Sequence, residues 1–234
     1  MTRKPRIVAM IPARGGSKSV PYKNLEMLGD RPLLAWPIET AKQAPEIGEV
    51  YVSTDDDRIA AVARDYGAEV IRRPDALATD SALVIDAIRH LRDVLERDGD
   101  PIEVMVLLEA TSPFREAGLV SRCINRLLDE ELDSIATFHQ ADINPERTWR
   151  VEDGAPRPFI DGAIPWKPRQ QLTPAYQLNG AVYAFRPGKL PEDSPSLLYG
   201  KMGAEIVSAS SVIDIDEKED FVRANAILSA RNSS

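Results

Sequence analysis

The sequence has few of the residues on which disulfide-bonded proteins and histidine-dependent enzymes rely. It contains one cysteine, Cys123, and two histidines, His90 and His139. A lone cysteine excludes an internal disulfide and suits a reducing compartment. Two histidines offer little for a Ser-His-Asp or Cys-His catalytic set, and His139 has no second histidine nearby with which to share a metal ion. These absences argue against covalent nucleophilic catalysis.

Long hydrophobic runs and an excess of positive charge are also missing. No apolar run is long enough for a membrane span, and the basic N-terminus is followed by only a short apolar stretch. We therefore expect no signal peptide. The net charge of -8 argues against a nucleic-acid or membrane-surface protein. The expectation is a cytoplasmic protein with neither a nucleic-acid nor a membrane partner.

What is present is the pattern of an α/β domain. Apolar, strand-like runs at 7–11, 50–54, 67–71 and 102–108 alternate with helical patterns. This alternation predicts a parallel sheet with right-handed crossovers, and the most hydrophobic run, 102–108, predicts its central strand. We expect helices over 31–44, with a kink or a late start because of Pro37, and over 58–66, 84–95 and 114–130.

A loop rich in glycine and basic residues follows the first predicted strand. Gly15 and Gly16 let the backbone come close to a ligand and expose its N–H groups. Arg14, Lys18 and Lys23 place three cations within ten residues. This combination suits an anion as large as a triphosphate, although the loop is neither a Walker motif nor Gly-x-Gly-x-x-Gly. The alternative is a glycine-rich turn with solvated basic residues.

Two acidic segments could bind a metal ion. Asp214 and Asp216 are two residues apart, so in an extended strand both carboxylates share a face and could hold Mg²⁺ together with phosphate oxygens. The alternative is that Asp216 and Glu219 form an N-cap pair for the last helix. For Asp55-Asp56-Asp57 we favour capping of the next helix over metal binding.

The loop resembles that of a known family. Residues 13–24 read Ala-Arg-Gly-Gly-Ser-Lys-Ser-Val-Pro-Tyr-Lys-Asn. They are similar to Ala-Arg-x-x-Ser-Lys-Gly-x-Pro-x-Lys-Asn of the acylneuraminate cytidylyltransferases. Further matches are Arg-Pro-x-x-Leu-Ala-x-Asp-x-Ala at 73–82, Thr-Ser-Pro-x-Arg at 111–115, Pro-Arg-Gln-Gln-Leu at 168–172 and Asn-Gly at 179–180. The motifs occur in the family's order through most of the chain.

The resemblance implies a fold and a reaction. The fold would be a Rossmann-like three-layer nucleotidyltransferase domain over 1–234, with a mostly parallel sheet. A protruding dimerisation arm at 140–175 would complete the neighbour's site in a homodimer. The reaction would be transfer of CMP from CTP to the anomeric hydroxyl of a nine-carbon α-keto acid sugar such as a sialic acid, with Mg²⁺ as cofactor and pyrophosphate released. Two alternatives stay open: a nucleotidyltransferase acting on another small acid or phosphorylated acceptor, and a catalytically silent nucleotide-binding subunit.

The resemblance also assigns roles to residues. The catalytic residues would be Arg14, Lys18, Lys23 and Asp214. The nucleotide would contact Ala13, Arg14, Ser17, Asn24, Arg73, Ser81, Thr111 and Ser112. The acceptor would contact Glu109, Arg147, Arg169, Gln170 and Asn179. The metal ligands would be Asp214 and Asp216. On local pattern alone, Thr79, Asp80 or Ser81, and Thr111 or Ser112, would instead cap the helices that follow them.

Four positions depart from the family's pattern. Ser19 replaces a glycine, Glu109 a glutamine, Ala110 a proline and Gln177 an arginine. The changes at Glu109 and Gln177 both make the acceptor pocket less positive. A carboxylate also accepts hydrogen bonds without donating any, whereas an amide does both. We therefore expect an acceptor that differs from the family's best-known substrate.

Overall fold

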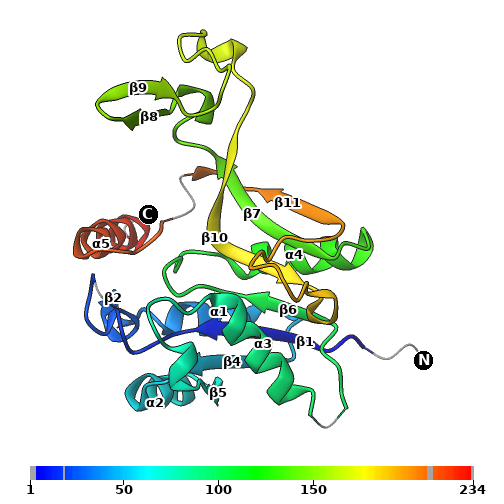
Figure 1. Ribbon diagram of the computed structural model, residues 1–234. Coiled ribbons are helices and arrows are strands. Elements are labelled where there is room, and N and C mark those ends of the chain that lie inside the picture. The colour runs from blue at the N-terminus through cyan, green and yellow to red at the C-terminus, as the bar shows by residue number, and fades with distance from the viewer. Residues whose placement is uncertain (1–3, 18, 98, 210–212, 233–234) are drawn as a thin grey trace.

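The computed structural model describes residues 4–17, 19–97, 99–209 and 213–232. Its centre is a seven-stranded sheet in the order β11-β7-β10-β6-β1-β4-β5 (Figure 1). The strands are β1 (Ile7–Pro12), β4 (Glu49–Thr54), β5 (Glu69–Arg72), β6 (Val104–Leu107), β7 (Ser134–Gln140), β10 (Tyr176–Phe185) and β11 (Met202–Ile206). Only β10 runs against its neighbours β6 and β7 in this sheet; the other pairings are parallel. The predicted mostly parallel sheet is confirmed, with β6 at its centre.

Helices cover both faces of the sheet. They are α1 (Ala35–Gln43), α2 (Asp57–Asp65), α3 (Val84–Leu95), α4 (Ala117–Asp129) and α5 (Lys218–Asn232). Ile7, Ala9 and Ile11 of β1 belong to one core cluster with residues of α1, α2 and α4, whereas Val8 and Met10 belong to another with residues of α3. A strand buried on both faces needs no polar alternation, which is why 7–11 is continuously apolar. The three-layer expectation is confirmed.

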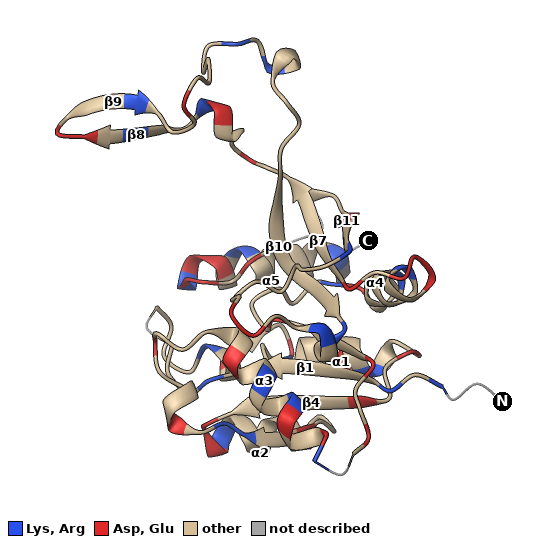
Figure 2. Cartoon of the chain, turned by 45° about the vertical axis from the view of Figure 1, so that its right-hand side comes forward, with Lys and Arg blue, Asp and Glu red and all other residues tan. Residues whose placement is uncertain are grey.

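Charged residues lie mainly on the helices and loops, and the strands are largely free of them (Figure 2). A separate small core lies under α5, where Phe221 and Ala224 pack with Leu28 and Leu33. No helix in the described part of the chain has the length and apolar character needed to cross a bilayer.

The first helix shows the late start that was one of the two outcomes expected from Pro37, and the fourth begins three residues later than the pattern predicts. Arg31–Pro32 forms the short strand β3, paired with β2 (Met27–Leu28), so α1 begins only at Ala35. Pro37 is then its third residue, where the missing N–H costs nothing because the first N–H groups of a helix have no intrahelical partner. The helix expected from 114 begins at Ala117, after Glu116.

The chain between β7 and β10 leaves the sheet and forms an arm, residues 141–175, that projects from the body (Figure 1). It contains the hairpin of β8 (Trp149–Glu152) and β9 (Ala155–Pro158). Trp149 and Trp166 pack with ring centroids 6.0 Å apart, yet Trp166 stays 82% exposed and Phe159 63% exposed. Such apolar exposure on a projecting segment is typical of a surface that another chain covers.

The expected capping role of the triple-aspartate segment is confirmed for one of its members. The Asp56 carboxylate accepts hydrogen bonds from the N–H groups of Arg58 at 2.8 Å and Ile59 at 3.2 Å. The Arg58 side chain and these N–H groups lower the pKa of Asp56 below its usual value. We expect Asp56→Ala to lower the free energy of unfolding by about 1 kcal/mol, measured by urea denaturation near neutral pH.

Asp57→Ala is the matched control. Its carboxylate is almost fully exposed and pairs only with Arg72 at 2.6 Å, so we expect its loss to change stability by less than about 0.5 kcal/mol. Equal losses in the two variants would contradict a capping role for Asp56.

Candidate functional site

The candidate site lies at the carboxyl ends of β1 and β6, where the strand order reverses around β1. Ligands of open α/β sheets bind at such a switch point. The residues after β1 and β6 enclose a loop hollow there. It is lined by Pro12, Arg14, Gly16, Ser17, Lys23, Asn24, Glu109, Ala110 and Thr111.

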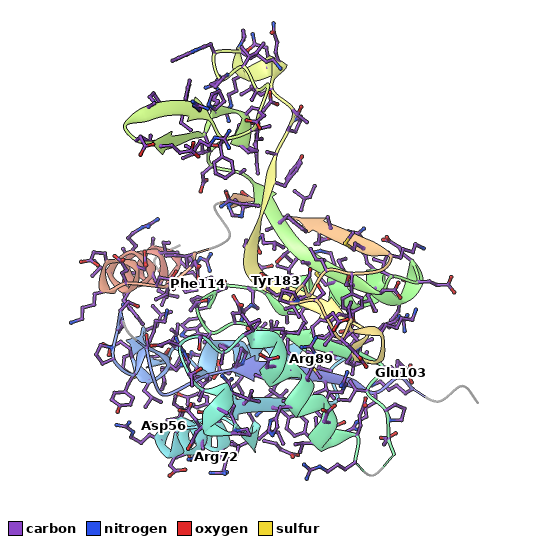
Figure 3. The ribbon with its side chains drawn as sticks, in the orientation of Figure 1. Asp56, Arg72, Arg89, Glu103, Phe114 and Tyr183 are labelled. Carbon is purple, nitrogen blue, oxygen red and sulfur yellow. The ribbon has the colours of Figure 1, made fainter. Side chains whose placement is uncertain are left out.

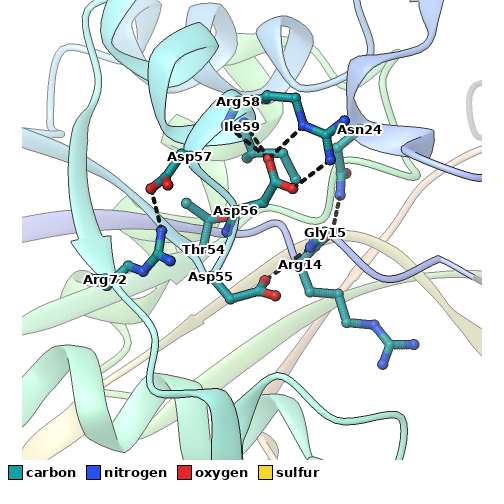
Figure 4. A network of polar contacts seen from close by, with 10 residues as sticks. All are labelled: Arg14, Gly15, Asn24, Thr54, Asp55, Asp56, Asp57, Arg58, Ile59 and Arg72. Atoms are coloured by element: carbon teal, nitrogen blue, oxygen red, sulfur yellow. Dashed lines mark hydrogen bonds and ion pairs between the residues drawn. The ribbon is translucent and has the colours of Figure 1, made fainter.

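The loop after β1 is fixed by the ends of neighbouring strands. The Gly15 N–H donates to the Asp55 carboxylate at 2.9 Å, and the Asn24 side chain donates to the Arg14 carbonyl at 3.2 Å (Figure 4). A Cβ atom on Gly15 would lie 2.9 Å from the Cβ of Asp56, so only glycine fits without displacement. The sequence analysis missed this role of Asp55, because the contact joins residues that are far apart in the chain.

The two described loop cations, Arg14 and Lys23, bind different segments of the chain. Arg14 donates to the Thr79 carbonyl at 3.0 Å and to the Asp80 carboxylate at 2.9 Å. Lys23 donates from Nζ to the Ile215 carbonyl and to the Asp216 carboxylate, both at 3.0 Å. Lys18, the third predicted cation, lies outside the described residues.

The remaining predicted nucleotide residues divide into two groups. Ser17, Asn24 and Thr111 line the loop hollow. Ala13 and Arg73 instead bind the end of β4: the Ala13 N–H donates to the Ser53 carbonyl at 3.0 Å, and Arg73 donates to the same carbonyl at 2.8 Å. Arg73 is only 6% exposed, and this burial lowers its pKa. Arg73 is therefore buried against the end of β4 and is not among the described residues that line the loop hollow.

The predicted helix caps near the site are wrong. Helix α3 begins after Leu83 without a side-chain cap, and Ser81 lies in the exposed turn before it, 3.3 Å from the Thr79 hydroxyl. Helix α4 begins after Glu116, so neither Thr111 nor Ser112 caps it. Ser112 instead donates to the Asn179 carbonyl at 3.2 Å, a long-range bond that local pattern does not reveal.

Asp214 and Asp216 point to one side of an extended segment. Both are exposed, whereas the alternating Ile213 and Ile215 are buried. Although Asp214 is exposed as a residue, neighbouring groups withdraw its carboxylate partly from water, and this raises its pKa. A hydrogen bond with the Thr111 hydroxyl opposes the shift, and the charge of Asp216 adds to it. The segment is held in place because the Ile215 N–H donates to the Thr111 carbonyl at 2.8 Å.

The alternative N-cap role of Asp216 with Glu219 is also wrong. Helix α5 begins at Lys218, and the Asp220 carboxylate in its first turn accepts the N–H groups of Asp216 at 3.0 Å and Glu217 at 2.9 Å. The Asp216 carboxylate is left to face Lys23, and the Ser19 hydroxyl donates to the Asp216 carbonyl at 2.6 Å.

Glu109 belongs to two hollows. Besides the loop hollow, it lines a central hollow between β7, β10 and the segment of Asp214. The central hollow is lined by Glu109, His139, Asp142, Gln177, Leu178, Asn179, Gly180, Tyr183, Ala209, Ile213, Asp214 and Arg223. Burial raises the pKa of Glu109, the Arg115 guanidinium opposes this shift, and the charges of Asp214 and Asp216 add to it.

A bulge in β10 shapes the wall beside Glu109. The pairing of β10 with β7 is interrupted between Leu178 and Tyr183. Gly180 there has a φ of 69°, a conformation that favours glycine, and a Cβ atom on it would displace the Glu109 carboxylate, which would lie 2.8 Å away. The Asn179 carbonyl oxygen Oδ1 accepts from the Thr137 hydroxyl at 2.5 Å and from the Ala181 N–H at 3.1 Å.

The five predicted acceptor residues are not brought together within one chain. Glu109 and Asn179 line the central hollow. Arg147, Arg169 and Gln170 line an arm hollow, which is enclosed by residues of 140–147 and 169–175 and adjoins the central hollow at Asp142. Arg147 there donates to the Lys167 carbonyl at 2.9 Å.

The sequence analysis assigned no site role to several residues of the central hollow, among them His139, Asp142, Tyr183 and Arg223. His139 and Gln177 are register partners across β7 and β10, so the replaced arginine position faces a histidine. Tyr183 and Arg223 also line the hollow, and burial raises the pKa of Tyr183 to about 12. The pairing of β7 with β10 could have pointed to His139, but only once the register was known.

Comparison with known proteins decides the family. The sequence profile of the family described as "Cytidylyltransferase" matches residues 8–193. The chain belongs to this family. The match includes the loop after β1, Glu109 and the arm, but ends before Asp214 and Asp216.

Curated relatives agree over nearly the whole chain. The N-acylneuraminate cytidylyltransferase of Escherichia coli O18:K1:H7 is 32% identical over 97% of this chain, which spans about half (53%) of that relative. The CMP-N,N'-diacetyllegionaminic acid synthase of Legionella pneumophila is 30% identical, with 95% of this chain and 96% of the relative covered. The post-translational flagellin modification protein B of Campylobacter coli is 28% identical, with 97% and 96% covered.

Solved structures share the fold. A CMP:2-keto-3-deoxy-manno-octonic acid synthetase in complex with CTP superposes with a TM-score of 0.73 at 20% identity, over 97% of this chain and 99% of that one. The 4-diphosphocytidyl-2C-methyl-D-erythritol synthase of Anaerococcus prevotii gives a TM-score of 0.65 at 19% identity, over 97% and 100%. The nucleotidyltransferase fold expected from the sequence is confirmed.

The raised pKa of Glu109 predicts that replacing this residue increases the stability of the fold, and that the increase depends on pH. An acid whose pKa is higher in the folded than in the unfolded state destabilises the fold wherever it must ionise, and has no effect once both states are protonated. Without metal or nucleotide, Glu109→Gln should therefore raise the Tm by a few degrees near neutral pH. The gain should vanish as the pH falls below about 4.

Glu103→Gln, an exposed residue just before β6, is the control and should leave the Tm unchanged at both pH values. A Tm of Glu109→Gln below that of the unmodified protein at neutral pH would contradict the burial effect.

Proposed function

We propose that this chain transfers CMP from CTP to the anomeric hydroxyl of a nine-carbon α-keto acid sugar and releases pyrophosphate. The observation that carries the proposal is the meeting of Lys23 with Asp216 at the switch point of the sheet. This contact brings the basic loop and the paired aspartates together at the loop hollow. Glu109 lines both the loop hollow and the central hollow, so the two adjoin. The named activities of the E. coli and Legionella relatives support the same reaction.

The residues present fit a magnesium ion. Asp214 and Asp216 expose two carboxylates on one side of an extended segment, beside the loop that would hold the phosphates. Within the described residues no group of three or more His, Cys, Asp or Glu side chains could enclose a metal. Two carboxylates completed by phosphate oxygens and water are the usual Mg²⁺ arrangement at nucleotides. When bound, Mg²⁺ would neutralise phosphate charge and polarise the phosphorus.

The chain's own residues would act by position and charge. The N–H groups of the loop, together with Arg14, Lys18 and Lys23, would bind the triphosphate over the loop hollow. Glu109 and Asn179 would orient the sugar in the central hollow, so that its anomeric hydroxyl lies in line with the α-phosphorus. In-line displacement needs no covalent nucleophile, in agreement with the scarcity of histidine and cysteine. We also propose a cytoplasmic location, because the proposed reaction consumes CTP.

The first test is pyrophosphate release with CTP and Mg²⁺ across a panel of nine-carbon α-keto acid sugars. Asp214→Asn should lower kcat at least about 100-fold, because a lost metal ligand removes charge neutralisation in the transition state. Its affinity for CTP without metal should stay close to that of the unmodified protein. Asp129→Asn, at the exposed end of α4, is the control and should keep full activity.

Full activity of Asp214→Asn would exclude the metal role. Tight CTP binding without turnover on any acceptor, in the unmodified protein, would favour the silent-subunit alternative. Turnover restricted to a phosphorylated or shorter acid would favour the other alternative.

We further propose a homodimer in which each arm completes the partner's central hollow. The support is the exposed apolar surface of the arm, including Trp166 and Phe159, and the position of Arg147 and Arg169 away from Glu109 of their own chain. A basic pair would be needed there, because α-keto acid sugars carry a carboxylate and the central hollow has few cations.

Subunit mixing tests this arrangement. Arg169→Ala and Asp214→Asn should each be inactive alone, since each dimer site would lack an arm cation or a metal ligand. After mixing and subunit exchange, activity should return to about a quarter of the unmodified level, because half of the dimers are mixed and each has one intact site. Arg157→Ala, on the exposed β9, is the control and should be active alone. No recovery, with mixed dimers demonstrated by sedimentation and tagged co-purification, would contradict a shared site.

A further inference from the structure

The central hollow is richer in acidic than in basic side chains. Among the described residues of one chain, Glu109, Asp142 and Asp214 line it, against the guanidinium of Arg223. Arg223 itself lies 3.5 Å from the Asp220 carboxylate, so part of its charge is already balanced. In the proposed dimer the arm arginines would pair with the sugar carboxylate and Asp214 with Mg²⁺, which leaves Glu109 and Asp142 for the rest of the acceptor. A hollow of this composition attracts a ligand group that carries positive charge or several hydrogen-bond donors.

Among these three acids, Glu109 is the one that is half-buried, whereas Asp142 and Asp214 are exposed. The charge of the buried Arg115 guanidinium acts on it. Within the described ranges no hydrogen bond or ion pair engages its carboxylate, and Arg115 donates instead to its main-chain carbonyl. The carboxylate is half-buried against the backbone of Gly180. A carboxylate withdrawn from water without a hydrogen-bonded partner is costly, and a cation or a set of donors placed beside it removes that cost.

Glu109 lies near the proposed metal ligands Asp214 and Asp216, but among the residues described it does not form a metal-binding group of three with them. No set of three or more acidic, histidine or cysteine side chains in the described part of the chain converges closely enough to hold one ion. The Glu109 carboxylate is therefore available to the acceptor, while Asp214 and Asp216 serve the phosphates.

A second observation shows that the hollow is built for a polar ligand. Asn179 is 7% exposed and lines the hollow, and its Nδ2 group has no hydrogen-bond partner in the described structure. Its orientation is fixed, because Oδ1 already accepts from Thr137 and Ala181. His139, 9% exposed, likewise has an unpartnered Nδ1. Unsatisfied buried polar groups are rare in folded proteins and are often completed by a ligand.

We infer that the natural acceptor carries a basic substituent, a protonated amine or amidine, that pairs with the Glu109 carboxylate. The inference rests on the proposed function, since it concerns the acceptor of that reaction. Glu109 is then the specificity-determining residue. A glutamine at this position could bond an amide equally well, whereas the carboxylate favours a cation with several donors. Asn179 offers the complementary donor to a hydroxyl oxygen of the same sugar.

The test compares acceptors that differ in one group. The probes are N,N'-diacetyllegionaminic acid and its two analogues in which one or the other acetamido group is replaced by acetamidino. An amidine has nearly the shape of an amide but is cationic. We expect pyrophosphate release with CTP and Mg²⁺ to show kcat/KM about tenfold or more higher for one acetamidino analogue than for the diacetyl sugar.

Glu109→Gln should remove this preference, so that the ratio of kcat/KM between the favoured acetamidino analogue and the diacetyl sugar falls to about one or below. Glu103→Gln, which Figure 3 places beside the N-terminal segment, should keep the preference. Thermal melting and CTP binding establish that each variant is folded, and Glu109→Asp should retain part of the preference because its charge is kept.

Each other outcome has a distinct meaning. A preference of the unmodified protein for the diacetyl sugar, or equal preferences in the unmodified protein and Glu109→Gln, would overturn the inference and leave the proposed function standing. Absence of CTP-dependent turnover on every probe and on the wider sugar panel would overturn the proposed function, and this inference with it.

Discussion

The site depends on the contact of Lys23 with the C-terminal segment. One ammonium group donates to the Ile215 carbonyl and to the Asp216 carboxylate, and so joins residues almost two hundred positions apart. The bond neutralises one of two neighbouring aspartates and fixes the rim of the loop hollow. Without it, two carboxylates would face an already acidic region, because Glu109 and Asp214 lie nearby.

Charge balance then explains how the two hollows divide their tasks. Cations from the loop after β1 concentrate on the loop hollow, where the phosphates are proposed to bind. The central hollow is lined by acidic residues, and the arginines that are proposed to complete it in a dimer line the arm hollow. Glu109 lines both hollows, so a glutamate in place of a glutamine changes the charge where the proposed phosphate and acceptor sites meet.

Local reasoning failed where a side chain had a better partner far away in the chain. Ser112 was a reasonable helix cap by pattern, but the Asn179 carbonyl takes its hydroxyl. The pattern also predicted Asp216 as a cap, but the Asp220 carboxylate accepts its N–H and Lys23 binds its carboxylate. Asp56 was predicted correctly, because its cap bonds are to the next few residues and need no tertiary contact.

The sequence by itself determined the parallel sheet with β6 at its centre, the basic loop after β1 and the alternating aspartates, because each is encoded in a short run of residues. Only the tertiary structure decided that Asp55 holds Gly15, that Arg73 supports β4 instead of lining the loop hollow, and that His139 faces Gln177. It also separated Arg147 and Arg169 from Glu109. The physical reason is that strand register and the course of the arm are set by contacts between segments far apart in the chain, which no local pattern records.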